Sequence, residues 1–378
     1  MRVGRPGSQV LNTVTEDSPR RRMLGVLARR PGPHLPFFPK IYGPWLQRHG
    51  EEVSEETLPA LLDTLHAGYM VACPSPVSIV RPCAQRKTHR TQERETEEIQ
   101  TPCGPLRTVR KRTLDAAAFL PVEPLIKDVQ DLERARTLYE GVTLEVDRTA
   151  LARIEALRSR YARTALLFVL VPDSPLMQLL KRDIGLADTH YLLQDHPREM
   201  EGLLEDIRLE GLRVTQKLVD VLGERIDCYV SGEDTSTTLL SPSQFRRWCV
   251  PYLNRQSEII HARGLVHLVH MCGYLKNLLP DMARLHADGF EALTTHPVGD
   301  VTNGEIAERL GDRIVIGGMN AALWLQHSAP DLIELIQRWR VQGILSRNLI
   351  LSSGGEMPPL VPVAKIKEVS RFLWEWQS

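Results

Sequence analysis

The sequence predicts an α/β fold, a (β/α)8 TIM barrel with an antiparallel β extension near its N-terminus. Six short runs of apolar and β-branched residues recur through the C-terminal two thirds of the chain, and helical patterns alternate with them. Such runs are typical of buried parallel strands, and repeated strand–helix units predict a parallel sheet. No glycine-rich phosphate loop follows any of the runs, which argues against an open dinucleotide-binding sheet.

The elements can be placed in chain order. Residues 1–22 are polar and basic and are expected to form a flexible arm, and residues 23–378 a single barrel domain. A β-rich excursion is expected at about 69–113, where Val, Ile and Thr alternate with charges as in antiparallel strands with a solvated face. Its basic residues either bind an acidic ligand or simply form a charged sheet surface. The six parallel strands are expected at 164–171, 226–231, 266–271, 290–294, 314–318 and 348–353.

Helix signals lie between these strands. Ser241 and Thr302 each begin a capping box, with Gln or Glu three residues later. Pro251 is expected to interrupt the first of these helices, and Gly311 to end the second. After Ser328, and again near the C-terminus, apolar residues recur on one helical face.

Composition restricts the class of protein. The 378 residues are 42% hydrophobic and 25% charged, with 47 basic and 47 acidic residues and a net charge of zero. A broad surface for nucleic acid is therefore not expected, and no apolar stretch is long enough to span a membrane. Six cysteines in a chain of this length do not suggest a disulfide framework, so a cytoplasmic protein with free thiols is expected.

Polar residues follow each predicted strand, and in a barrel these positions meet at one mouth, where active sites lie. The most specific pattern is His270-x-Cys272, because residues two apart in an extended segment point to the same side. Zn²⁺ accepts both as ligands and needs at least one more. By placement, the third ligand is Glu356, His296, Glu233 or Asp234. Chance and core packing also produce such pairs.

Other strand-end residues are candidates for catalysis or substrate binding. Glu233 and Asp234 are candidate catalytic carboxylates, although either can instead cap a helix or pair with an arginine. His296 is a candidate base or an ordinary surface histidine. Candidate substrate-binding residues are Asn320, which can equally cap a helix, with Thr235 and Asp173.

Several of these segments together resemble the uroporphyrinogen decarboxylase superfamily from about Leu24 onward. The resemblance is carried by residues 270–273, 316–320 and 351–362, and by Gly232-Glu233-Asp234 with Leu240-Ser241-Pro242. It implies a (β/α)8 barrel, and barrels of this family can pair as homodimers. The superfamily includes the decarboxylase of haem synthesis and zinc methyltransferases that exchange methyl groups with cobalamin on a corrinoid protein.

The resemblance is closer to the methyltransferase-like branch. The true decarboxylases carry an arginine-rich segment that binds substrate carboxylates, and the matching residues 35–45 contain no arginine. His270 and Cys272 match the methyltransferases, whereas their later cysteine corresponds here to Gly355. The resemblance then implies that Glu356, one residue on, completes a zinc site with His270 and Cys272, that a partner protein supplies cobalamin, and that the substrate is a small molecule.

Two alternatives remain open. One is a metal-free decarboxylase acting on a carboxylated substrate, with Asp234 stabilising a developing cation and basic residues of the N-terminal strands holding carboxylates. The other is a non-catalytic binding protein built on an inherited barrel. Two departures from the family allow it: the methyltransferase cysteine is absent, and Gly354-Gly355-Glu356 stands where the decarboxylases have Gly-His-Gly.

Overall fold

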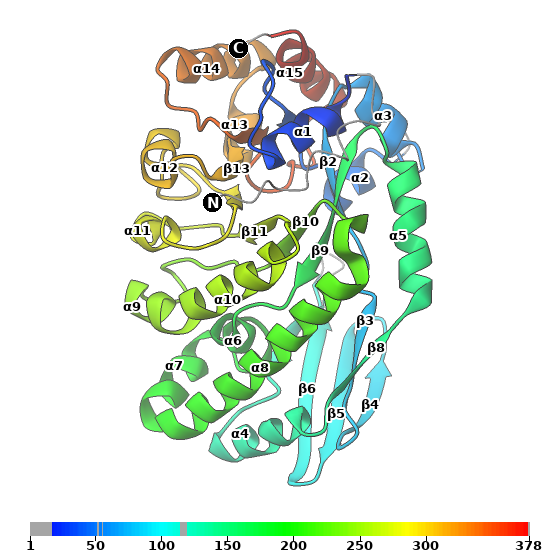
Figure 1. Ribbon diagram of the computed structural model, residues 1–378, viewed down its shortest axis with the longest axis vertical. Helices are drawn as coiled ribbons and strands as arrows, with labels where there is room; N and C mark the ends of the chain where they lie inside the picture. The colour runs from blue at the N-terminus through cyan, green and yellow to red at the C-terminus, as the bar shows by residue number, and fades with distance from the viewer. Residues whose placement is uncertain (1–16, 51–52, 55, 114–118, 377–378) are drawn as a thin grey trace.

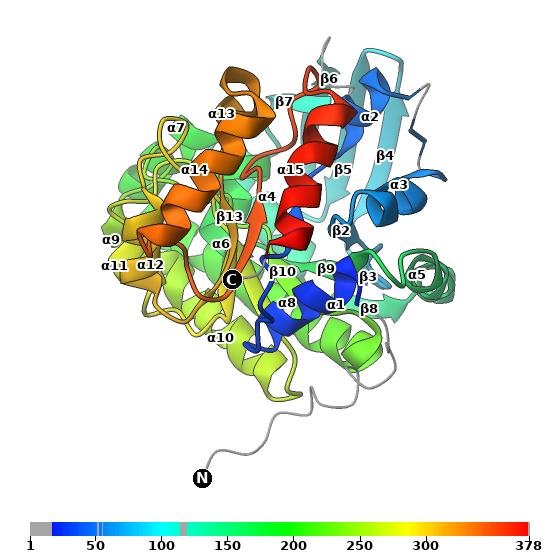
Figure 2. The same ribbon diagram turned by 90° about the horizontal axis from the view of Figure 1, so that it is seen from above.

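The computed structural model describes residues 17–50, 53–54, 56–113 and 119–376. Eight parallel strands form one sheet in the order β1-β14-β13-β12-β11-β10-β9-β2. The amide of Gly68, just before β2, donates to the carbonyl of Phe37 in β1 at 2.7 Å, which brings the two ends of the sheet together. The predicted (β/α)8 barrel is therefore confirmed (Figures 1 and 2).

The barrel strands are short and almost wholly apolar. They are β1 (Phe37–Phe38), β2 (Tyr69–Ala72), β9 (Ala165–Val171), β10 (Cys228–Ser231), β11 (His267–His270), β12 (Gly289–Leu293), β13 (Ile314–Gly318) and β14 (Leu349–Ser352). The last six coincide with the six predicted runs to within two residues. Residues of β10, β12, β13 and β14 are buried throughout, as expected for strands covered on both sides.

Helices cover the outside of the barrel. They are α2 (Gly43–Arg48), α3 (Leu58–Thr64), α6 (Pro175–Gln178), α7 (Leu186–Asp195), α8 (Pro197–Leu222), α9 (Pro242–Gln244), α10 (Val250–His261), α11 (Leu279–Met282), α12 (Asn303–Leu310), α13 (Ala321–Gln326), α14 (Ala329–Val341) and α15 (Val363–Glu375). Both predicted capping boxes are present, at Ser241 and Thr302, and Ser328 caps α14.

Two π-helical segments interrupt the helical cover. One, η5 (Phe245–Cys249), lies between α9 and α10, so the expected break near Pro251 takes the form of a π-turn that ends just before this proline. The other, η3 (Leu179–Asp183), continues α6 and carries Lys181 and Arg182. Single π-helical turns are frequent at functional sites, and η3 proves to contact the site described below.

The β-rich excursion is longer than expected. Barrel strand β2 is followed by β3 (Val77–Val80), which pairs with β8 (Thr143–Val146), and by an antiparallel sheet in the order β4-β5-β6-β7. The sheet's strands are β4 (Gln85–Arg90), β5 (Arg94–Thr101), β6 (Gly104–Arg112) and β7 (Phe119–Glu123). Helices α4 (Val129–Arg136) and α5 (Arg148–Arg160) and the short turn η2 (Thr137–Tyr139) lead back to the barrel. Ion pairs such as Arg110–Glu95 cross the sheet, in agreement with a charged sheet surface.

The boundary of the expected N-terminal arm differs in the structure. Residues 1–16 lie outside the described residues, but Ser18 caps helix α1 (Pro19–Leu27). Arg20, expected in the arm, is buried and pairs with Asp227 at 2.6 Å, while Arg22 lies over the ring of Trp374 in α15. These contacts anchor the start of α1, because a buried guanidinium needs a charged partner. In the part of the chain that the structure describes, no helix is long and apolar enough to cross a membrane.

Candidate functional site

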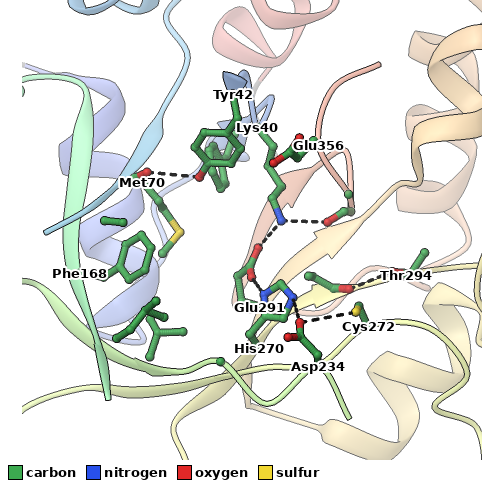
Figure 3. Close-up of a pocket in the computed structure, with 18 residues that line it drawn as sticks. Lys40, Tyr42, Met70, Phe168, Asp234, His270, Cys272, Glu291, Thr294 and Glu356 are labelled. Carbon is green, nitrogen blue, oxygen red and sulfur yellow. Dashed lines mark hydrogen bonds and ion pairs between the residues drawn. The ribbon is translucent and has the colours of Figure 1, made fainter. Parts of the chain in front are cut away.

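A cavity of about 640 Å³ opens at the C-terminal ends of the barrel strands. One wall is apolar and aromatic, and the other carries charged and sulfur-containing side chains (Figure 3). The lining residues include Phe38, Lys40, Tyr42, Met70, Phe168, Asp234, His270, Cys272, Glu291, Thr294 and Glu356. This is the end of a barrel at which active sites are found.

Three side chains on the charged wall form a compact group, here called the ligand cluster: Asp234, His270 and Cys272. One nitrogen, oxygen or sulfur atom of each lies within 4.8 Å of the others. His270 Nε2 is 3.0 Å from Asp234 Oδ1, and Cys272 Sγ is 4.0 Å from the same oxygen. His270 ends β11 and Cys272 follows two residues later, so both side chains face the cavity, as the sequence pattern predicts.

Glu291 and Lys40 hold the far side of the imidazole. His270 Nδ1 hydrogen-bonds one carboxylate oxygen of Glu291, and the other oxygen accepts from Lys40 Nζ at 2.6 Å. Lys40 also donates to the carbonyl of Gly354 at 3.0 Å. The loops after β1 and β14 are thereby tied to β12, and the imidazole is fixed with Nε2 turned toward Asp234 (Figure 3).

Lys181 holds the other oxygen of Asp234. Its Nζ lies 2.6 Å from Asp234 Oδ2 and 3.2 Å from Asp173 Oδ2, and it also donates to the carbonyl of Gly232. The lysine comes from the π-helical segment η3, so this irregular turn supports the ligand cluster. With Oδ2 engaged by Lys181, Oδ1 is left facing His270 and Cys272.

These contacts shift the pKa values of the site. Burial raises the pKa of Asp234, but hydrogen bonds from His270 and Lys181 outweigh burial and lower it to about 2. The pKa of Glu291 is likewise lowered to about 2, because Lys40 and His270 overcome the cost of burial. Burial lowers the pKa of His270, but its hydrogen bonds to Asp234, Cys272 and Glu291 raise it well above the usual range. Both carboxylates are thus ionised at neutral pH.

Backbone strain is concentrated here. Lys40, Asp234 and Ala292 adopt positive φ angles of 51°, 49° and 62°, although none is glycine. All three line the cavity. Non-glycine residues in this conformation persist only where surrounding contacts over-determine them, and they cluster at functional sites.

The ligand cluster fits a zinc ion. Zinc sites with three protein ligands and one open position use imidazole nitrogen, thiolate sulfur and carboxylate oxygen, and all three donor types are present. A metal-binding histidine usually hydrogen-bonds a carboxylate through its other nitrogen, as His270 does with Glu291. The cavity lies on the open side of the cluster.

Several predicted site residues are not brought to the cavity. Glu233 is fully buried and accepts from Ser174 Oγ at 2.8 Å and Thr235 Oγ1 at 3.2 Å, so it joins the ends of β9 and β10. Burial raises its pKa to about 7. Asp173 is buried against Lys181 and Arg182. Asp234 lies beyond the end of β10 and adopts a positive φ of 49°, and at this turn its side chain reaches the cavity, whereas Glu233 turns to Ser174.

The two candidates after β12 and β13 also have other roles. Asn320 is buried, caps α13 by accepting from the amide of Leu323, and donates to the carbonyl of His296 at 2.9 Å. His296 is exposed and does not line the cavity. The capping alternative for Asn320 and the surface alternative for His296 agree with this geometry.

Glu356 lines the cavity but lies outside the ligand cluster. It is near Lys40 and Tyr42 in Figure 3, away from Cys272, and Asp234 occupies the third position of the cluster instead. Glu356 was expected in the cluster because it is one residue from the position of a family cysteine. That correspondence fixes only the place of Glu356 along the chain, and not the direction of its side chain. The turn after β14, with Gly354 at φ 76°, carries the side chain to another part of the rim.

Sequence reasoning did not single out Glu291, Lys40 and Lys181. The available signal for Glu291 was its acidic side chain inside the otherwise apolar strand Gly289–Leu293. Lys40 follows a strand of two residues, too short to show a period, and Lys181 lies in a π-turn that has no simple pattern.

Comparisons with known proteins agree with this fold. The family model of uroporphyrinogen decarboxylase (URO-D) matches residues 184–376, more than half of the chain. A methyltransferase from Methanosarcina mazei is similar in structure, with a TM-score of 0.57 and 14% identity over 95% of this chain and 99% of that chain. Endo-glycoceramidase II from Rhodococcus sp. gives a TM-score of only 0.33 at 14% identity, over 59% of this chain and 66% of that chain, too low to support an argument. No curated protein matches the sequence.

Proposed function

Because this chain belongs to the uroporphyrinogen decarboxylase family, we propose that it is an enzyme of the family's methyltransferase-like branch. In this proposal a methyl group passes between a small methylated substrate or thiol acceptor and a corrinoid carried by a partner protein, with zinc assisting. The observation that carries it is the ligand cluster, in which three zinc-type donors lie close together at the cavity. The similarity in fold to a methyltransferase is consistent with this branch.

Each residue of the cluster has a role in this proposal. Asp234, His270 and Cys272 hold the metal, and when bound, zinc lowers the pKa of a thiol so that the thiolate is present at neutral pH. Glu291 keeps the imidazole oriented, and Lys40 keeps Glu291 ionised and in place. The thiol of the substrate would release its proton to solvent, and its sulfur, held at the ligand cluster, would accept the methyl group that the corrinoid of the partner protein would supply.

Decarboxylation is the alternative function that membership of the family suggests. A substrate with several carboxylates needs free cations, and among the described residues no arginine lines the cavity. Lys40, the one lysine there, is buried against Glu291, and three carboxylates share the cavity with it. The charges therefore disfavour a polycarboxylate such as uroporphyrinogen.

The direct test is a methyl-transfer assay with the zinc-loaded full chain. Methylcobalamin and a small alkyl thiol are supplied, and the loss of the methylcobalamin spectrum is followed together with the methyl thioether by mass spectrometry. We expect turnover that Cys272→Ser abolishes, while Cys83→Ser, at an exposed cysteine outside the cavity, retains it. Turnover of uroporphyrinogen by the metal-free protein, with no methyl transfer, would overturn the proposal.

A further inference from the structure

Glu356 is a carboxylate that is held in position and left unpaired. Lys40 Nζ donates to the carbonyl of Gly354, and the amide of Met357 donates to the carbonyl of Lys40, each at 3.0 Å. The backbone is therefore fixed on both sides of Glu356. The side chain is exposed and makes no hydrogen bond or ion pair with any residue that the structure describes. A fixed turn thus presents a free negative charge to the cavity.

The positive charges at the cavity are already engaged. Lys40 is bound to Glu291 at 2.6 Å with both side chains nearly buried. His270 lies between Glu291 and Asp234. Among the described residues, no other basic side chain lines the cavity. Away from the ligand cluster, an anionic group would therefore meet Glu356 without a free cation, whereas a cationic group has this carboxylate available.

The aromatic ring of Tyr42 lies near Lys40 and Glu356 at the cavity (Figure 3). Phe38 packs edge-to-face on Tyr42, with ring centroids 6.1 Å apart. The hydroxyl of Tyr42 donates a hydrogen bond to the carbonyl of Met70 at 3.2 Å. Burial raises the pKa of Tyr42 well above its usual value, and the charges of Tyr69, Glu291 and Glu356 act in the same direction. Aromatic faces attract cations, most strongly where water is excluded.

We propose that the cavity selects a thiol that also carries a positive charge, that is, an aminothiol. Its ammonium group binds Glu356 beside Tyr42, and its sulfur lies at the ligand cluster. Figure 3 shows the two binding groups on different sides of one cavity, with Lys40 between them. This substrate class rests on the proposed function, because the thiol end needs the zinc-loaded cluster.

The test compares thiols of equal length that differ in charge. Zinc-loaded full-length protein is titrated by calorimetry with 4-aminobutane-1-thiol, 4-mercaptobutan-1-ol and 4-mercaptobutanoate, and then with the two-carbon aminothiol and mercaptoalcohol. We expect the aminothiol to bind roughly tenfold more tightly than the alcohol, and the carboxylate to bind most weakly. Glu356→Gln should remove the preference for the aminothiol while the alcohol binds as before. Glu368→Gln, at an exposed acidic residue of α15, is the matched control.

The outcomes separate this inference from the proposed function. If the neutral thiol binds but the aminothiol has no advantage, or if the carboxylate binds most tightly, the aminothiol assignment is wrong and the zinc–thiol site stands. A preference that survives Glu356→Gln also overturns the role of Glu356. If none of the thiols binds the zinc-loaded protein, both proposals fail together.

Discussion

Asp234 is the residue that gives the ligand cluster its character. Its Oδ2 is held by Lys181 and its Oδ1 faces His270 and Cys272, so the third donor is an oxygen. An oxygen donor in place of a third sulfur or nitrogen makes the site harder. Its lowered pKa means that this carboxylate is ionised, as metal binding requires, across the physiological range.

Glu291→Gln should weaken zinc binding without removing a ligand. The amide cannot carry the charge that orients His270 and pairs with Lys40, and loss of such a partner typically lowers metal affinity by about 10- to 100-fold. Competition with a chromogenic chelator measures the affinity. Glu305→Gln, in the capping box of α12, is the control. Unchanged affinity in Glu291→Gln would show that Glu291 does not support a metal ligand.

Because of His267, the free energy of unfolding should be lower in mild acid than at neutral pH. It is fully buried between Ser231 and Ser257, and burial lowers its pKa from 6.5 to about 3. Below pH 6.5 the unfolded chain takes up a proton at this residue that the folded protein does not, so folding stability falls as pH falls from 6.5 toward 3. The loss is about 2 kcal/mol between pH 6.5 and about pH 5.

Urea unfolding at about pH 7.5 and about pH 5 checks this effect. His267→Gln should be less stable than the wild type at the higher pH, because it lacks both hydroxyl contacts of the ring, but its stability should change less between the two conditions. An equally steep pH dependence in His267→Gln would assign the effect to other groups.

At the scale of elements, regular strands were predictable and irregular ones were not. The six runs from residue 164 onward each became a barrel strand, because short, mainly apolar runs that alternate with helical patterns are typical of parallel strands buried on both faces. Strand β1 has two residues and carries no pattern, and β2 merges in sequence with the excursion that follows it. The site depends on such irregular parts, since Lys40 follows β1 and Lys181 lies in η3.

Helix α1 should depend on its buried ion pair. The guanidinium of Arg20 binds both carboxylate oxygens of Asp227 at 2.6 and 2.7 Å, and Asp227 also accepts from the amide of Leu167 in β9 at 2.7 Å. Arg20→Leu leaves this carboxylate buried without its cation, so the free energy of unfolding should fall by about 3–5 kcal/mol.

Denaturant unfolding of Arg20→Leu against Arg21→Leu measures the difference. Arg21 is exposed and no side-chain contact of it is found among the described residues, so its replacement should change stability by less than about 0.5 kcal/mol. Equal stability of the two variants would mean that α1 is held by its apolar contacts alone.

At the scale of the whole molecule, the barrel fold explains which parts of the site could be predicted from the sequence. Barrel geometry brings the ends of distant strands to one mouth, so the order of strand ends was enough to expect His270 and Cys272 there. Asp234 was one of four candidates for the third position, which the family resemblance gave to Glu356 instead, whereas the structure places Asp234 there. The order of the strand ends did not give the direction of each side chain. Glu233 turns inward to Ser174, and Glu356 is carried to another part of the rim, because these directions depend on local φ and on the turns at Asp234 and Gly354.

The most direct test of the account is the zinc content of the purified full chain and three variants, by elemental analysis after zinc loading and exhaustive dialysis. The account predicts about one zinc per chain for the wild type and for Glu356→Gln, and loss of zinc from both Asp234→Asn and Cys272→Ser. Zinc lost from Glu356→Gln but retained by Asp234→Asn would contradict the ligand cluster. A wild-type protein that binds no zinc would contradict the zinc-assisted reaction itself.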